Sequence, residues 1–313
     1  MPGSGCYKAL MKAILVTGAA GRVGSVGRTV TELLLARGVR VRAQVRADDD
    51  RAAKLRALGA DVVVGDMLDL TAMHAAMADC GTVCFGMSVD STYLEAVTNV
   101  AAVAKHHEVE AFINLSQMTV ASMDITHTTS SPQQKQHWLA EQVLSWSGLP
   151  VVEVRPTAFM EGLFLQVART IAMRNAIYVP FGTGKLSPIA ARDVARVIAD
   201  IAAAPARHVG RTYHLTGSTS QDMNTIAGEI SAALGRDIAY VDVPLDTWKQ
   251  QLAALSMSPH LVAHLVTMAQ LYRDNAYDRL TDDVERLTGQ PPMSIRDFIR
   301  IHAKAFEPSS GAR

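Results

Sequence analysis

The 313-residue chain lacks the features that mark several protein classes. It has no apolar run near the ~20 residues that a membrane-spanning helix needs. Lysine plus arginine and aspartate plus glutamate both number 30, so no excess charge favours nucleic acid or a membrane surface. The start of the chain has no apolar core of the kind found in secretory signals. We therefore expect a cytoplasmic protein that acts on a small molecule, without nucleic-acid or membrane partners and with a homodimer left open.

Cysteine is also scarce. Only Cys6, Cys80 and Cys84 occur, and they can neither all pair nor form a metal-binding spacing. We expect them to be reduced and mostly buried as small apolar residues. The histidines show no metal pattern either. The sequence therefore predicts neither a disulfide framework nor a metal centre.

What the chain does contain is a regular alternation of short apolar runs and helical segments. In the first half we expect strands at residues 13–16, 39–45, 61–64, 82–85, 111–115 and 151–154. We expect helices at residues 26–36, 52–58, 71–78, 93–105 and 133–146. This alternation predicts an α/β fold with a Rossmann-like, doubly wound parallel sheet and helices on both faces. We place this NAD(P)-binding domain at residues 12–155.

The remaining part predicts a smaller, mixed α/β C-terminal lobe over residues 156–307 that is interleaved with the first domain. Its helices are expected at residues 194–204, 223–234, 261–272 and 295–303, and its strands at 213–215 and 240–243. The polar stretch 117–131 is rich in serine and threonine and longer than most connections, which is typical of a lid, a binding loop or a disordered segment. Residues 1–11 and 308–313 are expected to be disordered.

The most informative motif is Val16-Thr17-Gly18-Ala19-Ala20-Gly21-Arg22-Val23-Gly24, which follows the first strand and precedes the first helix. Gly18 allows the tight turn, Gly21 lets the backbone approach a diphosphate, and Gly24 lets the helix pack closely on the sheet. The helix N-terminus then directs free N–H groups at the anion. The motif predicts a bound dinucleotide.

The end of the second strand favours NADP(H) over NAD(H). A carboxylate there would bind a free ribose 2′-hydroxyl, whereas an arginine suits a 2′-phosphate. The strand ends in Arg46, with no acid until Asp48, and Arg22 can add a second guanidinium. The alternative is that both arginines are ordinary surface residues. Asp66 stands where it could accept from the adenine amino group, or it could simply begin a loop.

These features resemble the short-chain dehydrogenase superfamily, in its atypical branch around the NmrA-like proteins. The resemblance covers residues 12–307 and rests on TGAAGRVG, the Arg46 strand end, VVVGDMLD, HWLAEQVLSWSGLP, VVEVRPTAFMEG, ARDVARV and LTGQPPMSIRDFIRIH. It implies NADPH-dependent reductases of quinones, azo dyes and other xenobiotics, or regulators that bind dinucleotide without turnover. The chain departs from the usual turn by the additional Ser25-Val26-Gly27. Gly27 costs about 1 kcal/mol in a helix relative to alanine, which predicts close backbone packing there.

A second departure concerns catalysis. Typical members of the superfamily carry Tyr-x-x-x-Lys on the helix after the loop, and alignment on Glu141 puts Gln133 at the tyrosine and His137 at the lysine. Glutamine does not titrate, which disfavours a tyrosine-driven dehydrogenation. His137 and Glu141 share a helix face, so the glutamate could raise the pKa of the imidazole and make it a proton donor. Alternatively, His137 only contacts ribose or packs near Trp138. Lys135 is expected to be solvated.

Ser116 takes the position of the superfamily's catalytic serine, so the candidate catalytic residues are His137, Ser116 and Glu141. Without the tyrosine, Ser116 is better read as a polar wall of the nicotinamide pocket. The resemblance implies cofactor contacts from Gly18, Ala20, Gly21, Arg22, Val23, Gly24, Arg46, Asp66, Met67, Phe85, Gly86, Met87, Ser116, His137, Pro156 and Thr157. Apolar side chains at Met118, Phe159 and Met160 are the candidate substrate contacts, with plain core packing as the alternative.

The leading hypothesis is an NAD(P)H-dependent oxidoreductase that transfers hydride to a small conjugated acceptor such as a quinone. The alternative is a non-catalytic, NADP(H)-sensing regulatory protein. A sugar-nucleotide epimerase or dehydratase ranks last, because such enzymes normally need the missing tyrosine.

Overall fold

Seven parallel strands form the central sheet. The computed structural model describes residues 12–21 and 26–308. The strand order is β3-β2-β1-β4-β5-β6-β8. The strands are β1 (Ala13–Val16), β2 (Val41–Val45), β3 (Asp61–Val64), β4 (Cys80–Phe85), β5 (Ala111–Leu115), β6 (Val151–Pro156) and β8 (Thr212–Leu215). The order reverses between β1 and β4, which confirms the predicted doubly wound, Rossmann-like sheet.

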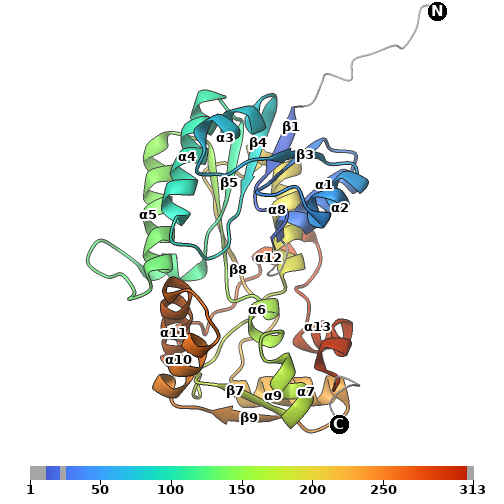
Figure 1. Cartoon of the computed structure of the whole chain (residues 1–313), viewed down its shortest axis with the longest axis vertical. Coiled ribbons are helices and arrows are strands. Elements are labelled where there is room, and N and C mark those ends of the chain that lie inside the picture. The colour runs from blue at the N-terminus through green and yellow to red at the C-terminus, as the bar shows by residue number, and fades with distance from the viewer. Residues whose placement is uncertain (1–11, 22–25, 309–313) are drawn as a thin grey trace, which may run out of the picture.

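Helices cover both faces of this sheet (Figure 1). They are α1 (Val26–Ala36), α2 (Asp50–Ala57), α3 (Leu70–Met77), α4 (Tyr93–His106), α5 (Pro132–Ser147) and α8 (Ala191–Ala203). Ile14 and Val16 of β1 share a core with α1, α2 and α8, whereas Ala13 and Leu15 share one with α3, α4 and α5. Strands that are buried on both faces read as continuous apolar runs, which is why β1 was visible in the sequence.

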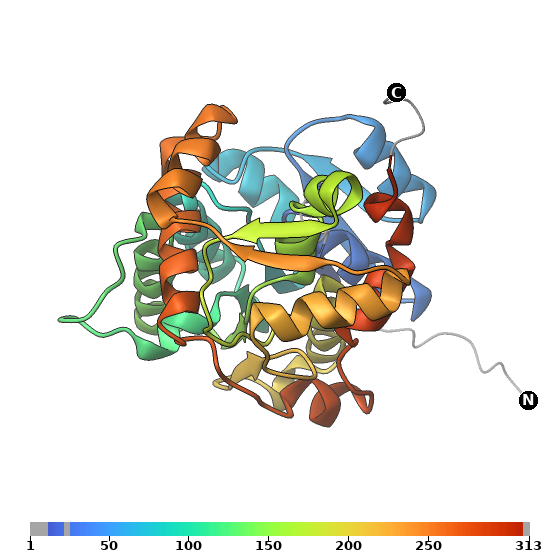
Figure 2. The ribbon, with the colours of Figure 1, turned by 90° about the horizontal axis from the view of Figure 1, so that it is seen from below.

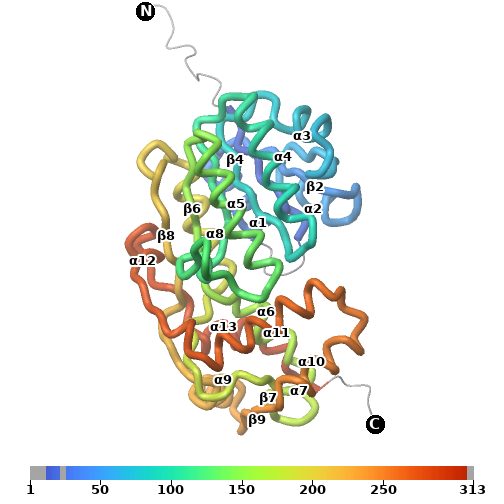
Figure 3. The backbone as a smooth tube through the Cα atoms, turned by 90° about the vertical axis from the view of Figure 1, so that its left-hand side faces the viewer, coloured from blue at the N-terminus to red at the C-terminus, as the bar shows by residue number. Residues whose placement is uncertain are grey.

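A second, smaller part lies beyond the carboxyl ends of these strands (Figure 3). It contains α6 (Met160–Phe164), α7 (Ala168–Arg174), β7 (Ala176–Val179), α9 (Met223–Leu234), β9 (Ala239–Asp242), α10 (Leu245–Ala254), α11 (Pro259–Arg273) and α13 (Ile295–Ile301). Helix α12 (Asp283–Thr288) instead packs with α8 and β8, because Val284 belongs to the same core as α1 and α8. Figure 2 shows β7 and β9 side by side on the side of the lobe that faces the viewer, where they pair in parallel. The range 156–307 also supplies β8 and α8 to the first domain, so the two parts share this stretch of chain.

Local capping explains where the element ends differ from the predicted ones. The expected strand 39–45 begins only at Val41, because the Val39 amide donates to the Leu34 carbonyl at the end of α1. Helix α2 begins at Asp50 rather than at residue 52, since the Asp49 carboxylate accepts from the first backbone amides. The stretch 117–131 is not wholly irregular, because Met118–Ser122 forms the 3-10 helix η1. Strand β7 and helices α6, α7, α10 and α12 were not predicted from the sequence.

Most of the termini that we expected to be disordered fall outside the described residues. Within the two described ranges, no helix combines the length and the apolar character that crossing a bilayer requires.

Candidate functional site

The end of β1 is tied to the end of β4 at the point where the strand order reverses. Thr17 Oγ1 donates to the Gly86 carbonyl at 3.1 Å and accepts from the Gly86 amide at 2.9 Å. Gly18 has a φ of +62°, and a Cβ there would lie 2.5 Å from the Gly86 carbonyl oxygen. The Gly21 amide donates to the Gly18 carbonyl at 3.0 Å. Only glycine fits at position 18, and the two strand ends meet with bare backbone.

Gly27, near the start of α1, packs closely against the backbone of the glycine turn. A Cβ on Gly27 would lie 3.0 Å from the carbonyl oxygens of both Thr17 and Gly18 and 3.1 Å from the Ala19 Cα. The close packing predicted for Gly27 is therefore confirmed. Arg22, Val23 and Gly24 lie outside the described residues.

Arg46, at the end of β2, is a cation whose neighbouring acids Asp48 and Asp49 pair with other arginines. Arg46 is exposed, and among the described residues no carboxylate lies within ion-pair distance of it. Asp48 instead accepts from Arg56 at 2.7 Å. Asp49 caps α2 and pairs with Arg51, whose Nη1 also donates to the Ala20 carbonyl at 2.8 Å. The position of Arg51 next to the glycine turn was not predicted, because no local sequence motif indicates it.

The ends of β3 and β4 complete this edge of the sheet. Asp66 is exposed, and its Oδ1 accepts from the Leu68 amide at 3.0 Å, so it closes a turn. The Met67 carbonyl accepts from the Asn99 side chain at 3.4 Å. Phe85 is 2% exposed and stacks on Phe112 inside the core, so any cofactor contact here comes from its backbone. Gly86 and Met87 are half-buried at the surface of the edge.

Ser116, Glu141 and Arg155 form a buried polar cluster at the ends of β5 and β6. Ser116 Oγ donates to Glu141 Oε1 at 2.6 Å, and Arg155 Nε donates to the same oxygen at 3.0 Å. Arg155 Nη2 also donates to Glu141 Oε2, which makes the pair bidentate. The side chain of Glu141 is 6% exposed and that of Arg155 18% exposed. Glu141 therefore orients Ser116 and Arg155.

The expected interaction between His137 and Glu141 is wrong. His137 instead contacts Tyr93, with ring centroids 4.0 Å apart and the two rings tilted, and within the described residues its buried Nδ1 has no hydrogen-bond partner. Burial, with a smaller contribution from His264, lowers the pKa of His137 to about 3. The prediction that His137 is charged near neutral pH is therefore also wrong. Burial disfavours the charged imidazole, and the Glu141 carboxylate, which could have favoured it, bonds to Ser116 and Arg155 instead. Lys135 is exposed.

Gln133, at the expected tyrosine position, joins the two parts of the chain. It is 1% exposed, and its Oε1 accepts from the Asp90 amide at 3.1 Å and from His260 Nε2 at 2.8 Å. Asp90 follows β4, whereas His260 begins α11 in the lobe. A neighbouring contact between Ser131 Oγ and His264 Nδ1, at 3.1 Å, reinforces the α5–α11 junction.

The end of β6 is fixed by backbone contacts. Pro156 closes the strand, the Thr157 amide donates to the Leu215 carbonyl at 2.9 Å, and Thr157 Oγ1 donates to the Ser187 carbonyl at 2.6 Å. Phe159 is half-buried. Met160 is fully buried in the core of the lobe, which is the packing alternative left open for it.

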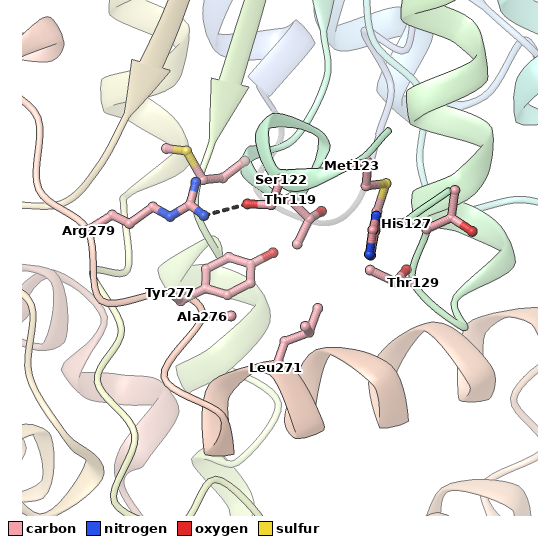
Figure 4. A pocket seen from close by; sticks show the side chains of 11 residues that line it. Thr119, Ser122, Met123, His127, Thr129, Leu271, Ala276, Tyr277 and Arg279 are labelled. Atoms are coloured by element: carbon pink, nitrogen blue, oxygen red, sulfur yellow. Dashed lines mark hydrogen bonds between the residues drawn. The ribbon is translucent and has the colours of Figure 1, made fainter. Parts of the chain in front are cut away.

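A pocket of about 190 Å³ opens directly after β5, between η1, the segment that follows it, and the end of α11 (Figure 4). Met118 lines it and so connects it to the predicted substrate contacts. The pocket also contains Tyr277 and Arg279, which the sequence analysis did not single out. Their position depends on how the lobe folds back over β5, so no spacing in the sequence could have revealed it.

Comparison with known proteins agrees with this geometry. The profile of the NmrA-like family matches residues 11–298. The chain belongs to the NmrA-like family. It is 30% identical over 295 residues to NAD(P)H azoreductase of Xenophilus azovorans, covering 94% of this chain and 99% of that protein. It is also 30% identical over 304 residues to (4-alkanoyl-5-oxo-2,5-dihydrofuran-3-yl)methyl phosphate reductase of Streptomyces griseus, with 94% and 99% covered.

The solved structures share the fold. A crystal structure of an NADPH-dependent quinone oxidoreductase from Escherichia coli, complexed with NADPH, matches with a TM-score of 0.79 at 20% identity. The match covers 93% of this chain and 99% of that one. At this identity the likeness concerns the fold alone.

Proposed function

We propose that this chain is an NADPH-dependent reductase of small conjugated acceptors such as quinones. The observation that carries the proposal is the close approach of Gly18 to Gly86, two residues without side chains at the ends of β1 and β4. In doubly wound sheets this edge is where a dinucleotide diphosphate binds. The similarity over 94% of the chain to an NAD(P)H azoreductase supports nicotinamide-dependent reduction as the chemistry.

Each part of the cofactor would meet a different strand end. The turn at Gly18, Ala20 and Gly21 would hold the diphosphate, and the backbone of Pro156 and Thr157 would hold the carboxamide. Arg46 would hold the 2′-phosphate, because a planar guanidinium group binds phosphate with paired hydrogen bonds. The engagement of Asp48 and Asp49 by other arginines supports NADP(H) over NAD(H).

The catalytic side chains act by position. When bound, NADPH supplies the hydride. A conjugated acceptor spreads the negative charge that arrives over several atoms and then takes a proton from water, so the reaction does not need a tyrosine at position 133. Ser116 directs its proton at Glu141 and therefore serves as a polar wall of the pocket. His137, neutral because of its burial, would contact the ribose and would not act as the acid.

Steady-state oxidation of NADPH with a panel of neutral quinones tests the proposal. Turnover is expected, and Arg46→Gln should raise KM for NADPH about tenfold while KM for NADH stays unchanged. Arg56→Gln removes the same charge from a guanidinium already paired with Asp48, and it is the matched control. A change of equal size in both KM values would contradict the role of Arg46.

One observation favours a second function, a regulator that senses NADP(H). Gln133 cannot titrate, and its oxygen is occupied from both sides. Tight binding of NADP⁺ without turnover of any quinone or azo compound would support this second function and overturn the first.

A further inference from the structure

We propose that the pocket behind β5 binds acceptors that carry an acidic substituent, with Arg279 as the group that holds the anion. The inference rests on the proposed reductase function and names its substrate class: a planar, conjugated body with a sulfonate, carboxylate or phosphate at one end. The pocket begins at Met118, two residues after Ser116, so it adjoins the predicted nicotinamide end of the site.

The lining of the pocket combines apolar side chains with several hydroxyl groups and a single permanent charge. Met118, Met123, Leu271 and the Tyr277 ring give it surfaces suited to a flat aromatic body. Arg279 is the charged residue among the residues that line it, and no carboxylate belongs to the lining. Figure 4 shows Arg279 at one end of the pocket with its guanidinium turned inward.

Arg279 keeps N–H donors of its guanidinium available for a ligand. One of its Nη groups donates to Ser122 Oγ at 2.5 Å, and within the described part of the chain no carboxylate lies within ion-pair distance of it. Neighbouring acids are already occupied: Asp278 accepts from Ser220 at 2.8 Å, and Asp283 pairs with Arg286. Arg279 as a residue is half-buried, and a charge near a protein surface attracts an anion more strongly than one in bulk water. His127, also in the lining, contacts Asp124 Oδ1 through its Nδ1 at 3.2 Å.

The pocket also contains a buried hydroxyl. Thr119 is 7% exposed, and within the described residues no hydrogen bond of standard geometry reaches its Oγ1. The Tyr277 hydroxyl lies close to it but donates to Met268 Sδ at 3.4 Å. Figure 4 shows the Thr119 side chain between Arg279 and His127. A buried hydroxyl without a partner is uncommon, and an acceptor oxygen of a ligand would satisfy it.

Binding measurements separate this inference from the reductase proposal, because they need no turnover. Isothermal titration would compare naphthalene-2-sulfonate with its neutral counterpart, naphthalene-2-sulfonamide. The sulfonate should bind the natural protein more tightly, and Arg279→Gln should weaken it about tenfold while the sulfonamide changes less than about twofold. Arg300→Gln removes an exposed arginine on α13 and should change neither. Equal affinity for the two ligands, or equal weakening of both by Arg279→Gln, would overturn the subsite.

A kinetic arm uses 1,4-naphthoquinone and its 2-sulfonate. The ratio of KM values between Arg279→Gln and the natural protein should rise about tenfold for the sulfonate alone, and taking this ratio cancels the different redox potentials of the two quinones. Sulfonate binding through Arg279 without reduction of either quinone would refute the reductase and keep the subsite. Reduction of both quinones with no dependence on Arg279 would support the reductase and refute the subsite.

Discussion

Gly27→Ala is the sharpest test of how the glycine turn is packed. Alanine normally stabilises a helix by about 1 kcal/mol over glycine. Here, however, the new Cβ would meet three backbone atoms at 3.0–3.1 Å, and backbone cannot rotate away as a side chain can. Overpacking of this kind costs about 1–3 kcal/mol. After the helix gain of about 1 kcal/mol is subtracted, we expect a net loss of up to about 2 kcal/mol, together with weaker NADPH binding, since the atoms that must move belong to the turn itself.

Gly228→Ala provides the matched control. Gly228 also lies within a helix, α9, but it is exposed and a Cβ there would meet nothing within 4 Å. That variant should gain about 1 kcal/mol, so thermal unfolding should separate the two variants by roughly 5 °C, with Gly228→Ala above the natural protein and Gly27→Ala below it. NADPH titration followed by fluorescence should show weaker binding for Gly27→Ala alone. A melting temperature for Gly27→Ala above the natural protein, with unchanged NADPH binding, would refute the reasoning.

Three further predictions concern the buried polar groups. Burial lowers the pKa of His137 to about 3, so between about pH 3 and 6.5 the unfolded chain binds more protons than the folded one. Stability is therefore lost as the pH falls through that range. His137→Gln should reduce the fall in melting temperature from pH 7 to 5, whereas His127→Gln, at an exposed position, should not. Glu141→Gln leaves the Arg155 guanidinium without its counter-charge and should cost about 2–4 kcal/mol, and adding Arg155→Gln should restore part of the loss in denaturant unfolding. Thr17→Val removes both hydrogen bonds between the β1 and β4 ends. It should lower the free energy of unfolding by about 1–3 kcal/mol and weaken NADPH binding. An unchanged free energy of unfolding and an unchanged affinity for NADPH would show that these two hydrogen bonds do not hold the strand ends together.

The dinucleotide-binding edge was largely predictable because its signals are local. Buried parallel strands are continuous apolar runs, and Gly18 and Arg46 stand at strand ends that the sequence identifies. The closeness of Gly27 to the turn could be inferred from the cost of a glycine within a helix. Arg51 could not be predicted, because its contact with Ala20 depends on how α2 returns across the turn.

The polar groups behind the site were predicted less well, since their behaviour depends on burial and on competing partners. The i,i+4 spacing does place His137 and Glu141 on one helix face, yet it cannot reveal that Arg155 arrives from β6 and binds the carboxylate. Nor does the sequence report the desolvation that keeps His137 neutral. Tyr277 and Arg279 reach the site only through the packing of the lobe.

The contacts of Gln133 have a consequence for the design of variants. Its oxygen receives donors from both the sheet domain and α11, so this position connects the sheet domain to the lobe. A tyrosine introduced there would lose both contacts and would have to displace His260 to find room. Restoring the superfamily's usual residue would therefore first alter the packing of α11 on the sheet domain, and a gain in proton transfer could be judged only after that change had been measured.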